Sequence, residues 1–183
     1  MPIDVLSDLL SDVNTSQNLL SPAPPLVAHR VFALLAMLWV GSQLTIGYAV
    51  APVLFASLDR MVAGSLAAQL FRIEGMLGLV SGVLLLGLAN VLIRRGETGY
   101  RRLRWLLIGM LLCVLIGYYA LQPFMNAMRM NAMQAGVDIA HSVWASRFGM
   151  LHGVSSVFYL VESLLGAWLV WLLPSARGAR AQR

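Results

Sequence analysis

Charged residues are scarce in this sequence, making up 11% of its 183 positions, whereas an average soluble domain carries roughly 25%. So few charges do not cover the surface of a folded soluble domain, and that class is excluded. Intrinsic disorder is excluded as well, because 59% of the residues are hydrophobic and aromatic residues are present. The composition therefore indicates a multi-span membrane protein.

Cysteine and lysine are also nearly absent. The one cysteine, Cys113, allows no internal disulfide and no cysteine-based metal cluster, and its apolar neighbours favour a buried thiol. All thirteen basic residues are arginines, and the net charge is +5. In a membrane protein, cytoplasmic loop charge explains this excess better than a nucleic-acid partner, so we expect none. The sequence contains no phosphate-binding loop, nucleophile triad or zinc motif.

Four apolar runs are long enough to cross a bilayer, which takes about 20 residues. They cover 31–51, 75–93, 105–122 and 149–173, within a membrane domain of 29–173. The alternating pattern typical of membrane barrels is missing, so we expect an all-α integral membrane protein, a four transmembrane helix bundle. We expect no sequence repeat between its halves.

The segments that flank this domain, 1–28 and 174–183, differ in composition. The first has an aspartate at every fourth position with aliphatic residues between, which predicts a cytoplasmic amphipathic helix on the membrane or on a partner. These aspartates are Asp4, Asp8 and Asp12. A proline-rich linker follows, and the acidic start excludes a cleavable secretory signal. The last ten residues form an arginine-rich cytoplasmic tail.

Arginine counts predict the orientation, since cytoplasmic loops carry the excess of positive charge. With the N-terminus inside, nine arginines lie on the inner side and four on the outer side. The inner group is Arg30, Arg94, Arg95, Arg101, Arg102, Arg104, Arg177, Arg180 and Arg183. The outer group is Arg60, Arg72, Arg129 and Arg147. Both termini are therefore expected in the cytoplasm.

The fourth run places an acid, Glu162, at the centre of the bilayer. A charged residue there costs about 2.5–3.5 kcal/mol, so such an acid faces the bundle interior, pairs or stays protonated. Spacings of three and four residues put a polar stripe on the same helix face. The stripe consists of His152, Ser155, Ser156, Tyr159, Glu162, Ser163 and Gly166. It predicts either interhelical hydrogen bonds or an interior polar track, from His152 to Glu162, that serves a pathway or ligand.

Residues of the first run are expected to face this acid. Gln43 and Thr45 lie at about the depth of Glu162 and are its candidate hydrogen-bond partners. Pro52 leaves the Tyr48 carbonyl without its helical donor. This predicts either a kink near the outer end of the run or a proline tolerated at a helix end.

Two outer connections are longer than simple turns. The segment 59–74 begins with a candidate N-cap, Asp59, and is either an interfacial helix or an extension of the second span. The segment 124–148 contains a methionine cluster. Met125, Met128 and Met133 share a face and carry thioether sulfurs that suit Cu(I), although methionine also fills apolar surfaces. Copper capture and simple packing both remain open.

Glycines at helical spacing supply small-residue faces, which predict close helix packing and a homo-oligomer or membrane complex. They are Gly75, Gly78, Gly82, Gly87, Gly109, Gly117, Gly149 and Gly153.

Three histidines raise a haem hypothesis. His29 and His152 belong to opposite ends of the membrane domain, so they do not ligate one iron. His141 and His152 are 11 residues apart, which is about 16 Å along a continuous helix and too far without a break. A bis-histidine haem is therefore disfavoured.

Two stretches resemble a known family. His29, Trp39-Val40-Gly41-Ser42-Gln43, residues 54–60 and Leu70-Phe71 resemble the first half of transmembrane-protein-205-like proteins, whose bacterial branch is called domain of unknown function 4149. Residues 147–156 resemble the later His-Gly-x-Ser-Ser signature of that family, and Pro123 also matches. The motif positions are His29, Trp39, Gly41, Phe55, Phe71 and Gly153. The resemblance covers about 28–165 and implies a four-span helical membrane protein without an established biochemical function. We expect the protein in the bacterial inner membrane.

Three functions remain open. The first is a non-enzymatic membrane protein whose polar interior, including Gln43 and Glu162, serves a small-solute, proton or metal-ion pathway. The second is an assembly or interaction subunit that uses its acidic N-terminal segment and glycine-rich faces. The third and weakest is a haem- or quinone-linked membrane enzyme.

Overall fold

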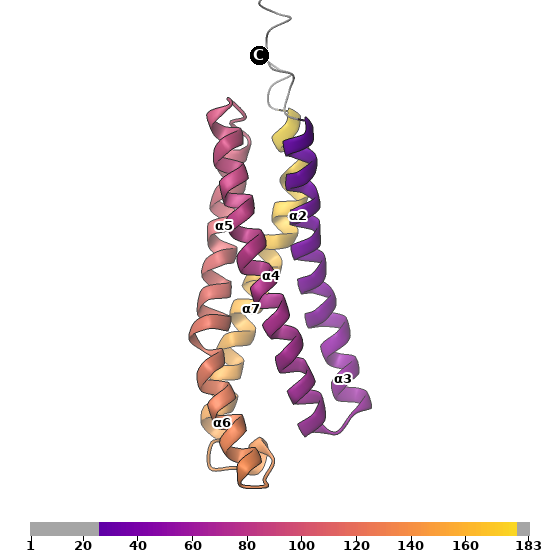
Figure 1. Cartoon of the computed structure of the whole chain (residues 1–183), viewed down its shortest axis with the longest axis vertical. Helices are drawn as coiled ribbons and strands as arrows, with labels where there is room; N and C mark the ends of the chain where they lie inside the picture. The colour runs from indigo at the N-terminus through magenta and orange to yellow at the C-terminus, as the bar shows by residue number, and fades with distance from the viewer. Residues whose placement is uncertain (1–25, 179–183) are drawn as a thin grey trace, which may run out of the picture.

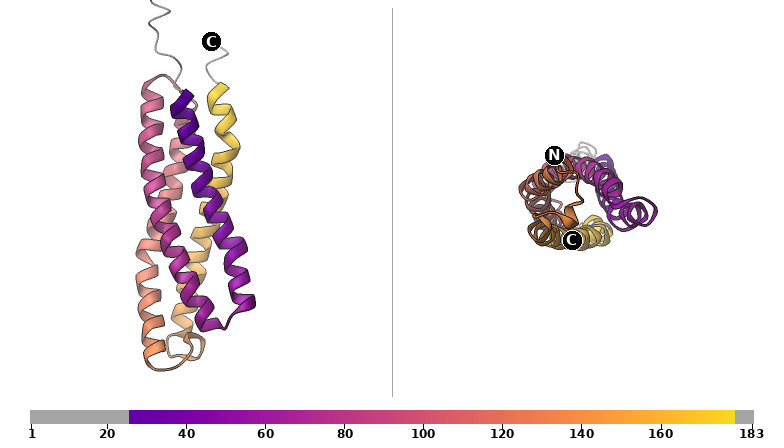
Figure 2. Two further views of the ribbon diagram at one scale, coloured as in Figure 1. Left: turned by 45° about the vertical axis from the view of Figure 1, so that its right-hand side comes forward. Right: turned by 90° about the horizontal axis from the view of Figure 1, so that it is seen from below.

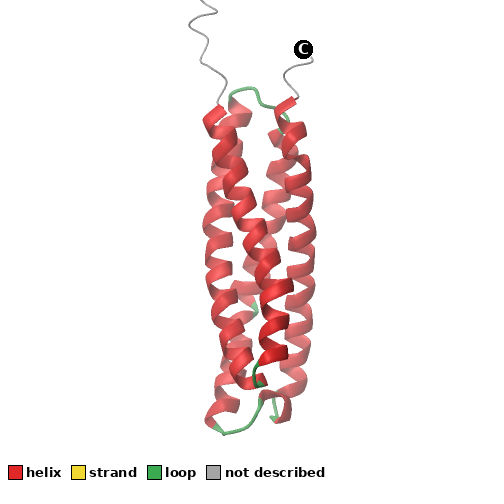
Figure 3. Cartoon of the chain, turned by 90° about the vertical axis from the view of Figure 1, so that its right-hand side faces the viewer, coloured by secondary structure: helices red, strands yellow, loops and turns green. Residues whose placement is uncertain are grey.

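The computed structural model describes residues 26–178, with side chains described for 27–173. These residues form helices joined by short loops, and no strand occurs among them (Figure 3). Four long helical rods run side by side and alternate in direction, which makes this part of the chain a four-helix bundle (Figure 1). The all-α fold expected from the sequence is confirmed.

Two of the four rods are continuous helices and two contain a π-helical turn. The first rod consists of α2 (Leu26–Thr45), the π-helical turn η1 (Ile46–Val50) and α3 (Ala51–Ser57). The second is α4 (Arg60–Arg94). The third consists of α5 (Tyr100–Val114), the π-helical turn η2 (Leu115–Ala120) and α6 (Gln122–Gln134). The short 3₁₀ turn η3 (Ile139–His141) leads to the fourth, α7 (Ala145–Gly178).

The exterior of the bundle is apolar and its interior is partly polar. All four rods are long and apolar enough to cross a membrane. Leu34, Val83 and Leu164 are more than half exposed, whereas Gln43 and Glu162 are buried. A water-soluble domain has the opposite arrangement, so this distribution identifies a multi-pass membrane protein.

One end of the bundle, which we call the basic end, carries the start of α2, the α4–α5 turn and the end of α7 (Figures 1 and 2). Arginines 94, 95, 101 and 102 are exposed there. Exposed tryptophans of α5 and α7 lie near the same end, with Trp105 at 66% and Trp171 at 81% exposure. Arginine and tryptophan together are typical of a membrane–water interface. Gly96 closes the α4–α5 turn at φ +93°, a left-handed conformation that favours glycine.

Each π-helical turn lies directly before a helix with proline in its first turn. Proline lacks an N–H and its ring crowds the carbonyl four residues earlier, and a wider turn relieves that crowding. The Ala51 N–H accordingly donates to the Ile46 carbonyl, five residues back. The Leu121 N–H likewise donates to the Ile116 carbonyl at 3.1 Å. Pro52 is therefore accommodated by a local π turn, and the helical path continues into α3.

The two π-helical turns also share a tripeptide. Ile46-Gly47-Tyr48 opens η1, and Ile116-Gly117-Tyr118 lies in η2. Both rods run from the basic end and are followed by a rod that returns to it (Figure 2). The shared segment is only three residues long, and the spacing from isoleucine to proline differs by one residue between its two occurrences.

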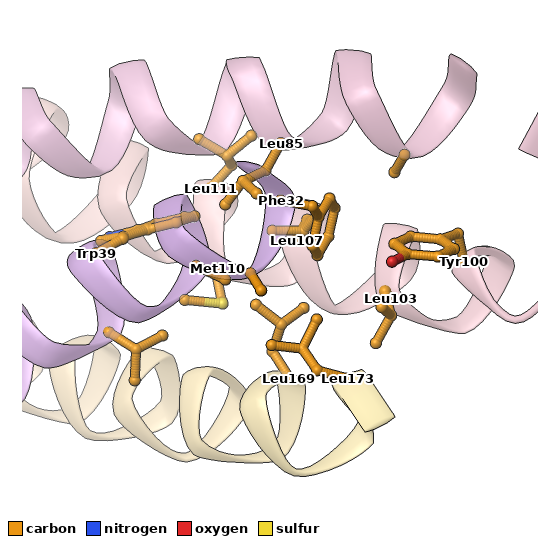
Figure 4. Close-up of a cluster of buried hydrophobic side chains, with 14 of the residues drawn as sticks. Phe32, Trp39, Leu85, Tyr100, Leu103, Leu107, Met110, Leu111, Leu169 and Leu173 are labelled. Atoms are coloured by element: carbon orange, nitrogen blue, oxygen red, sulfur yellow. The ribbon is translucent and has the colours of Figure 1, made fainter. Parts of the chain in front are cut away.

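The half of the bundle next to the basic end, which we call the dense half, is filled by apolar side chains from all four rods (Figure 4). Trp39, Leu85, Leu107 and Leu169 have no exposed surface. Lipid tails are as apolar as leucine, so close van der Waals contact stabilises this core more than removal from water does. The stability of this core therefore depends on the fit between side chains, and small changes in side-chain volume should lower it markedly.

Glycines on α4 make this contact possible. A Cβ added at Gly78 would lie 2.7 Å from Trp39 Nε1, and one at Gly82 would lie 2.5 Å from Leu111 Cδ2. Gly75, Gly109 and Gly117 also lie against neighbouring side chains. An added Cβ at Gly87, Gly149 or Gly153 would meet nothing within 4 Å. Five of the eight predicted packing glycines therefore pack within the described part of the chain, and three face outward.

A polar cluster closes the dense half at the basic end. A hydrogen bond of 2.8 Å joins His29 Nδ1 on α2 and the Tyr100 hydroxyl on α5. Glu97, in the α4–α5 turn, has an oxygen 3.9 Å from His29 Nε2. All three residues are buried. These contacts tie the start of the first rod to the turn between the second and third.

The long outer connections are partly helical. Because α4 runs without interruption from Arg60, the segment 59–74 is an extension of the second span. Asp59 occupies the N-cap position, but its side chain accepts no capping hydrogen bond. The third rod continues to Gln134 and takes up the first part of 124–148. The expected amphipathic helix of 1–28 lies outside the described residues except for its last three positions, and so do residues 179–183.

Candidate functional site

The half of the bundle away from the basic end, which we call the hollow half, contains a cavity of about 470 Å³. It is lined by residues of η1, α3, α4, the end of α5, η2, α6 and α7. Here α3 packs on α4 and α6 packs on α7, but α4 does not pack on α6 and α3 does not pack on α7. In Figure 1 the two pairs diverge away from the basic end. The cavity is therefore flanked by openings between the helix pairs.

Two acids lie at the deep end of this cavity. Glu74 of α4 and Glu162 of α7 both line it and are 5% and 3% exposed. Each has one carboxyl oxygen that is buried without a hydrogen-bond partner among the described residues. The two carboxyl groups are also close enough to interact electrostatically. Two rods thus bring an acid each to one buried space inside the membrane domain.

Two polar groups at the boundary with the dense half add to this environment. Trp39 Nε1 and Gln43 Oε1 are buried and form no hydrogen bond of good geometry within 26–178. The Trp39 indole nevertheless lies near enough to act on the Glu162 carboxyl. Unpartnered polar atoms of α2, from residues that do not line the cavity, therefore lie close to those of α4 and α7, and buried polar groups are rarely left without a partner.

Aromatic rings form part of the cavity wall beside the acids. Tyr159 of α7 contacts Phe71 of α4 edge to face, with ring centroids 5.3 Å apart. It also lies 6.1 Å from the ring of Tyr48. Tyr118, from the second π-helical turn, lies against Gly75, directly after Glu74. All four rings line the cavity, so the acids are accompanied by π faces from α4, α7 and both π-helical turns.

Hydrogen bonds fix the position of Tyr159 and its neighbours. The Tyr159 hydroxyl donates to the backbone carbonyl of Gln43, and Gly47 leaves room for the Tyr159 ring. The Ser163 hydroxyl donates to the Tyr159 carbonyl at 2.8 Å. It accepts from Gln43 Nε2 at 3.4 Å and from the Tyr48 hydroxyl at 3.2 Å. This network joins α7 to the first rod just beside Glu162.

The mouth of the cavity is basic and aromatic. The Arg129 guanidinium lies 5.6 Å from the centre of the Phe148 ring. His152 stacks on the same phenylalanine with ring centroids 6.0 Å apart. Arg129 and His152 both line the cavity, at the end opposite the two acids. Basic residues and acids therefore lie at opposite ends of the cavity.

The structure brings together most of the predicted polar residues. His152, Ser155, Ser156, Tyr159 and Glu162 all line the cavity. Gln43 is fully buried, but its amide bonds to Ser163 and its side chain does not line the cavity. Thr45 is exposed, which corrects its expected role as a partner of Glu162. Their part in any function stays a prediction.

The motif positions of the family resemblance occupy different environments. Phe55 and Phe71 line the cavity, and Trp39 belongs to the dense half. Gly41 and Gly153 are exposed on the outer face. The motif therefore includes outward-facing positions as well as cavity and core residues.

Sequence reasoning missed Glu74, because the second span was expected to begin after it. The apolar residues Val62, Leu66 and Ile73 of this segment are exposed on the outer face. The buried face instead carries Ala63, Ala67 and Glu74. A small-residue stripe that includes one acid was the available signal, since a membrane helix turns its apolar face outward and its small or polar face inward. Arg129 was missed as a site residue because the third span was expected to end at residue 122, whereas α6 continues to Gln134. Tyr118 lay inside the expected span but was not assigned to the site.

The described residues do not bring the predicted copper or haem ligands together at one site. Met125 is buried and lines the cavity, whereas Met133 is 43% exposed. Met128 is half-buried. The three methionines therefore do not share one environment. No cluster of three histidine, cysteine or acidic residues suited to a metal occurs within the described residues, and His29 and His152 lie at opposite ends of the bundle.

The fold and the cavity together define a four-span α-helical membrane protein with two acids inside its bundle. Residues 34–134, more than half of the chain, match the family described as domain of unknown function (DUF4149), and the chain belongs to this family. The match runs from α2 to the end of α6, so it includes Trp39 and Glu74 but not His29 or α7. Comparison with curated proteins and with solved structures finds no match.

Proposed function

We propose that this protein is a non-enzymatic membrane protein that binds a small solute in the cavity of the hollow half. The supporting observation is that Glu74 and Glu162, each more than nine-tenths buried, border one cavity and keep an unpartnered oxygen. Acids inside a membrane domain are costly and usually mark an ion or substrate site. The volume of about 470 Å³ lies in the range of small-molecule pockets, roughly 300–1,000 Å³.

A binding pocket fits this architecture better than an open channel. The cavity ends at Glu162, and beyond it Trp39, Leu107 and Leu169 fill the dense half without exposed surface. A solute, proton or metal ion would cross the membrane only if these side chains moved apart. Transport, if it occurs, would therefore require a rearrangement of the dense half, while binding requires none.

We place the protein in a bacterial inner membrane with both termini in the cytoplasm. Arg94, Arg95, Arg101 and Arg102 at the basic end support this orientation, because positive charge accumulates on the cytoplasmic side. In this orientation the cavity belongs to the outer leaflet. Reporters fused after Arg104 and at the C-terminus should read cytoplasmic, and one at Gln134 should read periplasmic. A cytoplasmic reading at Gln134 would reverse the assignment.

The pocket can be tested by its accessibility to a membrane-soluble reagent. Dicyclohexylcarbodiimide partitions into bilayers and adds covalently to carboxyl groups that it can reach. We expect it to modify Glu74 and Glu162, located by mass spectrometry of the protein in membranes. Glu97 is the internal control, because it is equally buried at 4% exposure but belongs to the dense half of the bundle.

The result depends on how carbodiimide modification of Glu74 and Glu162 compares with that of Glu97. Modification of Glu74 and Glu162 without Glu97 would support a pocket that small molecules enter. If all three acids react alike, or none reacts while exposed carboxyls do, the cavity does not select these acids and the proposed function fails.

A second candidate, an assembly subunit, is favoured by one observation. Gly149 and Gly153 of α7 are exposed at a spacing of four residues, and an added Cβ would meet nothing at either position. Such a pair lets a second helix approach closely in a membrane. Replacing both by leucine should lower the cross-linked dimer fraction in membranes if this face joins two copies, and should leave it unchanged otherwise.

A further inference from the structure

The ligand class follows from the chemistry of the cavity wall, an inference that rests on the proposed binding function. We infer that the cavity binds a lipophilic organic cation of the ammonium or phosphonium type, with its charge at Glu74 and Glu162 and its apolar groups against the neighbouring rings. The charge, the rings, the hydrogen-bonding state and the openings of the cavity each support this assignment.

The two carboxyl groups at the deep end favour a cation as the ligand. Glu74 and Glu162 contribute two carboxyl groups there, and each keeps an oxygen free to accept. Arg72 of α4 is exposed and lies near Tyr118, but no ion pair joins it to Glu74 or Glu162 among the described residues. The Arg129 guanidinium lies over the Phe148 ring. Phe148 precedes Glu162 by fourteen residues on α7, which is about 21 Å along the helix axis. The cations of the protein therefore leave the two acids without a basic partner.

The aromatic wall suits a large cation with delocalised or alkylated charge. Tyr159, Phe71 and Tyr48 form linked ring contacts beside the acids, with centroids 5.3 and 6.1 Å apart. A cation near such faces is attracted by the ring quadrupole, and this attraction grows where water is excluded. Rings of this kind recognise alkylated cations, which offer no hydrogen-bond donor of their own.

The hydroxyl groups of the wall argue against an anion. Tyr159 donates to the Gln43 carbonyl, and Ser155 donates to the Gly117 carbonyl at 3.4 Å. Ser156 donates to the His152 carbonyl at 2.8 Å. These three hydroxyl protons are already used within the protein, so the α7 side of the wall offers a ligand oxygen acceptors and π faces. An anion needs donors, whereas an onium cation needs none.

The openings of the cavity favour a lipophilic molecule. Phe55 of α3 and Ser156 and Leu160 of α7 line the cavity and are exposed, and α3 does not pack on α7. A ligand that dissolves in the bilayer can reach the acids through this gap without displacing the dense half. A strongly hydrated metal ion would first have to lose its water in the lipid, which is costly.

The test uses the full chain, purified in a mild uncharged detergent, with tetraphenylphosphonium as the probe. Equilibrium dialysis should give saturable binding to the wild type. Glu74→Gln and Glu162→Gln should each weaken binding about tenfold or more, which is 1.4 kcal/mol or more. Glu97→Gln is the matched control, since it removes an equally buried acid outside the cavity, and it should bind like the wild type.

Two further measurements on the wild type do not depend on the folding of any variant. Triphenylphosphine oxide, a neutral molecule of related shape, should not compete with tetraphenylphosphonium. Cys113, the one cysteine of the chain, lines the cavity beside Glu162. Tetraphenylphosphonium should therefore slow the alkylation of Cys113 by N-ethylmaleimide, and triphenylphosphine oxide should not.

The outcomes separate the ligand class from the pocket itself. Absence of saturable binding, competition by the neutral molecule, or Gln variants that fold and bind like the wild type would overturn the cation assignment. If Glu74 and Glu162 still react with the carbodiimide in that case, the pocket stands and only the ligand class is wrong. If tetraphenylphosphonium does not bind and the carbodiimide does not modify Glu74 and Glu162, the cation assignment and the proposed function are both wrong.

Discussion

Three glutamates of this bundle are equally buried, yet they lie in opposite surroundings. In the dense half, Glu97 has His29 3.9 Å away and Tyr100 close by, with side chains filling the space around them. In the hollow half, Glu74 and Glu162 keep unpartnered oxygens beside a cavity. Burial alone therefore does not mark a functional acid in this protein. The distinction lies in whether partners and close contacts use up the space around the carboxyl group.

The largest expected effect comes from adding volume to each half. Ala89→Phe places a ring where the side chain has no exposed surface in the dense half, so we expect the bundle to lose about 3 kcal/mol or more. Ala67→Phe, on the same helix, extends into the cavity and should cost far less. Thermal unfolding in detergent measures both. Equal losses of stability for the two variants would show that the dense half and the hollow half are equally closely packed.

A smaller effect is expected from two glycines of α4. A Cβ at Gly82 would lie 2.5 Å from Leu111 Cδ2 and 3.0 Å from Trp39 Cη2, whereas one at Gly87 would meet nothing. Gly82→Leu should therefore lower the unfolding temperature and reduce the free energy of unfolding by about 1–3 kcal/mol. Gly87→Leu, with the same gain in helix propensity, is the control and should match or exceed the wild type. Two equally harmful changes would show that α4 packs on both faces.

The smallest effect concerns two tyrosine hydroxyls. Tyr100→Phe removes the buried 2.8 Å bond to His29 and should cost about 1–2 kcal/mol. Tyr48→Phe removes a 3.2 Å bond to Ser163 from a side chain that is 51% exposed, so we expect a few tenths of that loss. Chemical unfolding in mixed micelles can resolve the difference. A larger loss for Tyr48 would mean that the hollow half holds the bundle together.

The sequence predicted the four helices and the interior position of Glu162, because hydropathy and depth along one helix need no knowledge of neighbours. It did not predict Glu74. Spans of about 20 residues left this acid outside, whereas α4 has 35 residues, about 52 Å at 1.5 Å per residue, and Glu74 lies near its middle. The cavity itself was beyond prediction. It depends on which helices fail to touch, and periodicity within a single helix carries no information about that.

The π-helical turn η1 has a consequence for how the wall of the cavity is encoded. A π turn contains one residue more than an α turn, and each residue of an α-helix advances the chain by about 100°. Deleting one residue from Ile46–Val50 would rotate all of α3 by that angle and carry Phe55 off the cavity wall, with no change in any side chain. The identity of the lining residues is thus set by a residue count as well as by residue type. Among related chains, a one-residue gap at this position would signify a different binding surface.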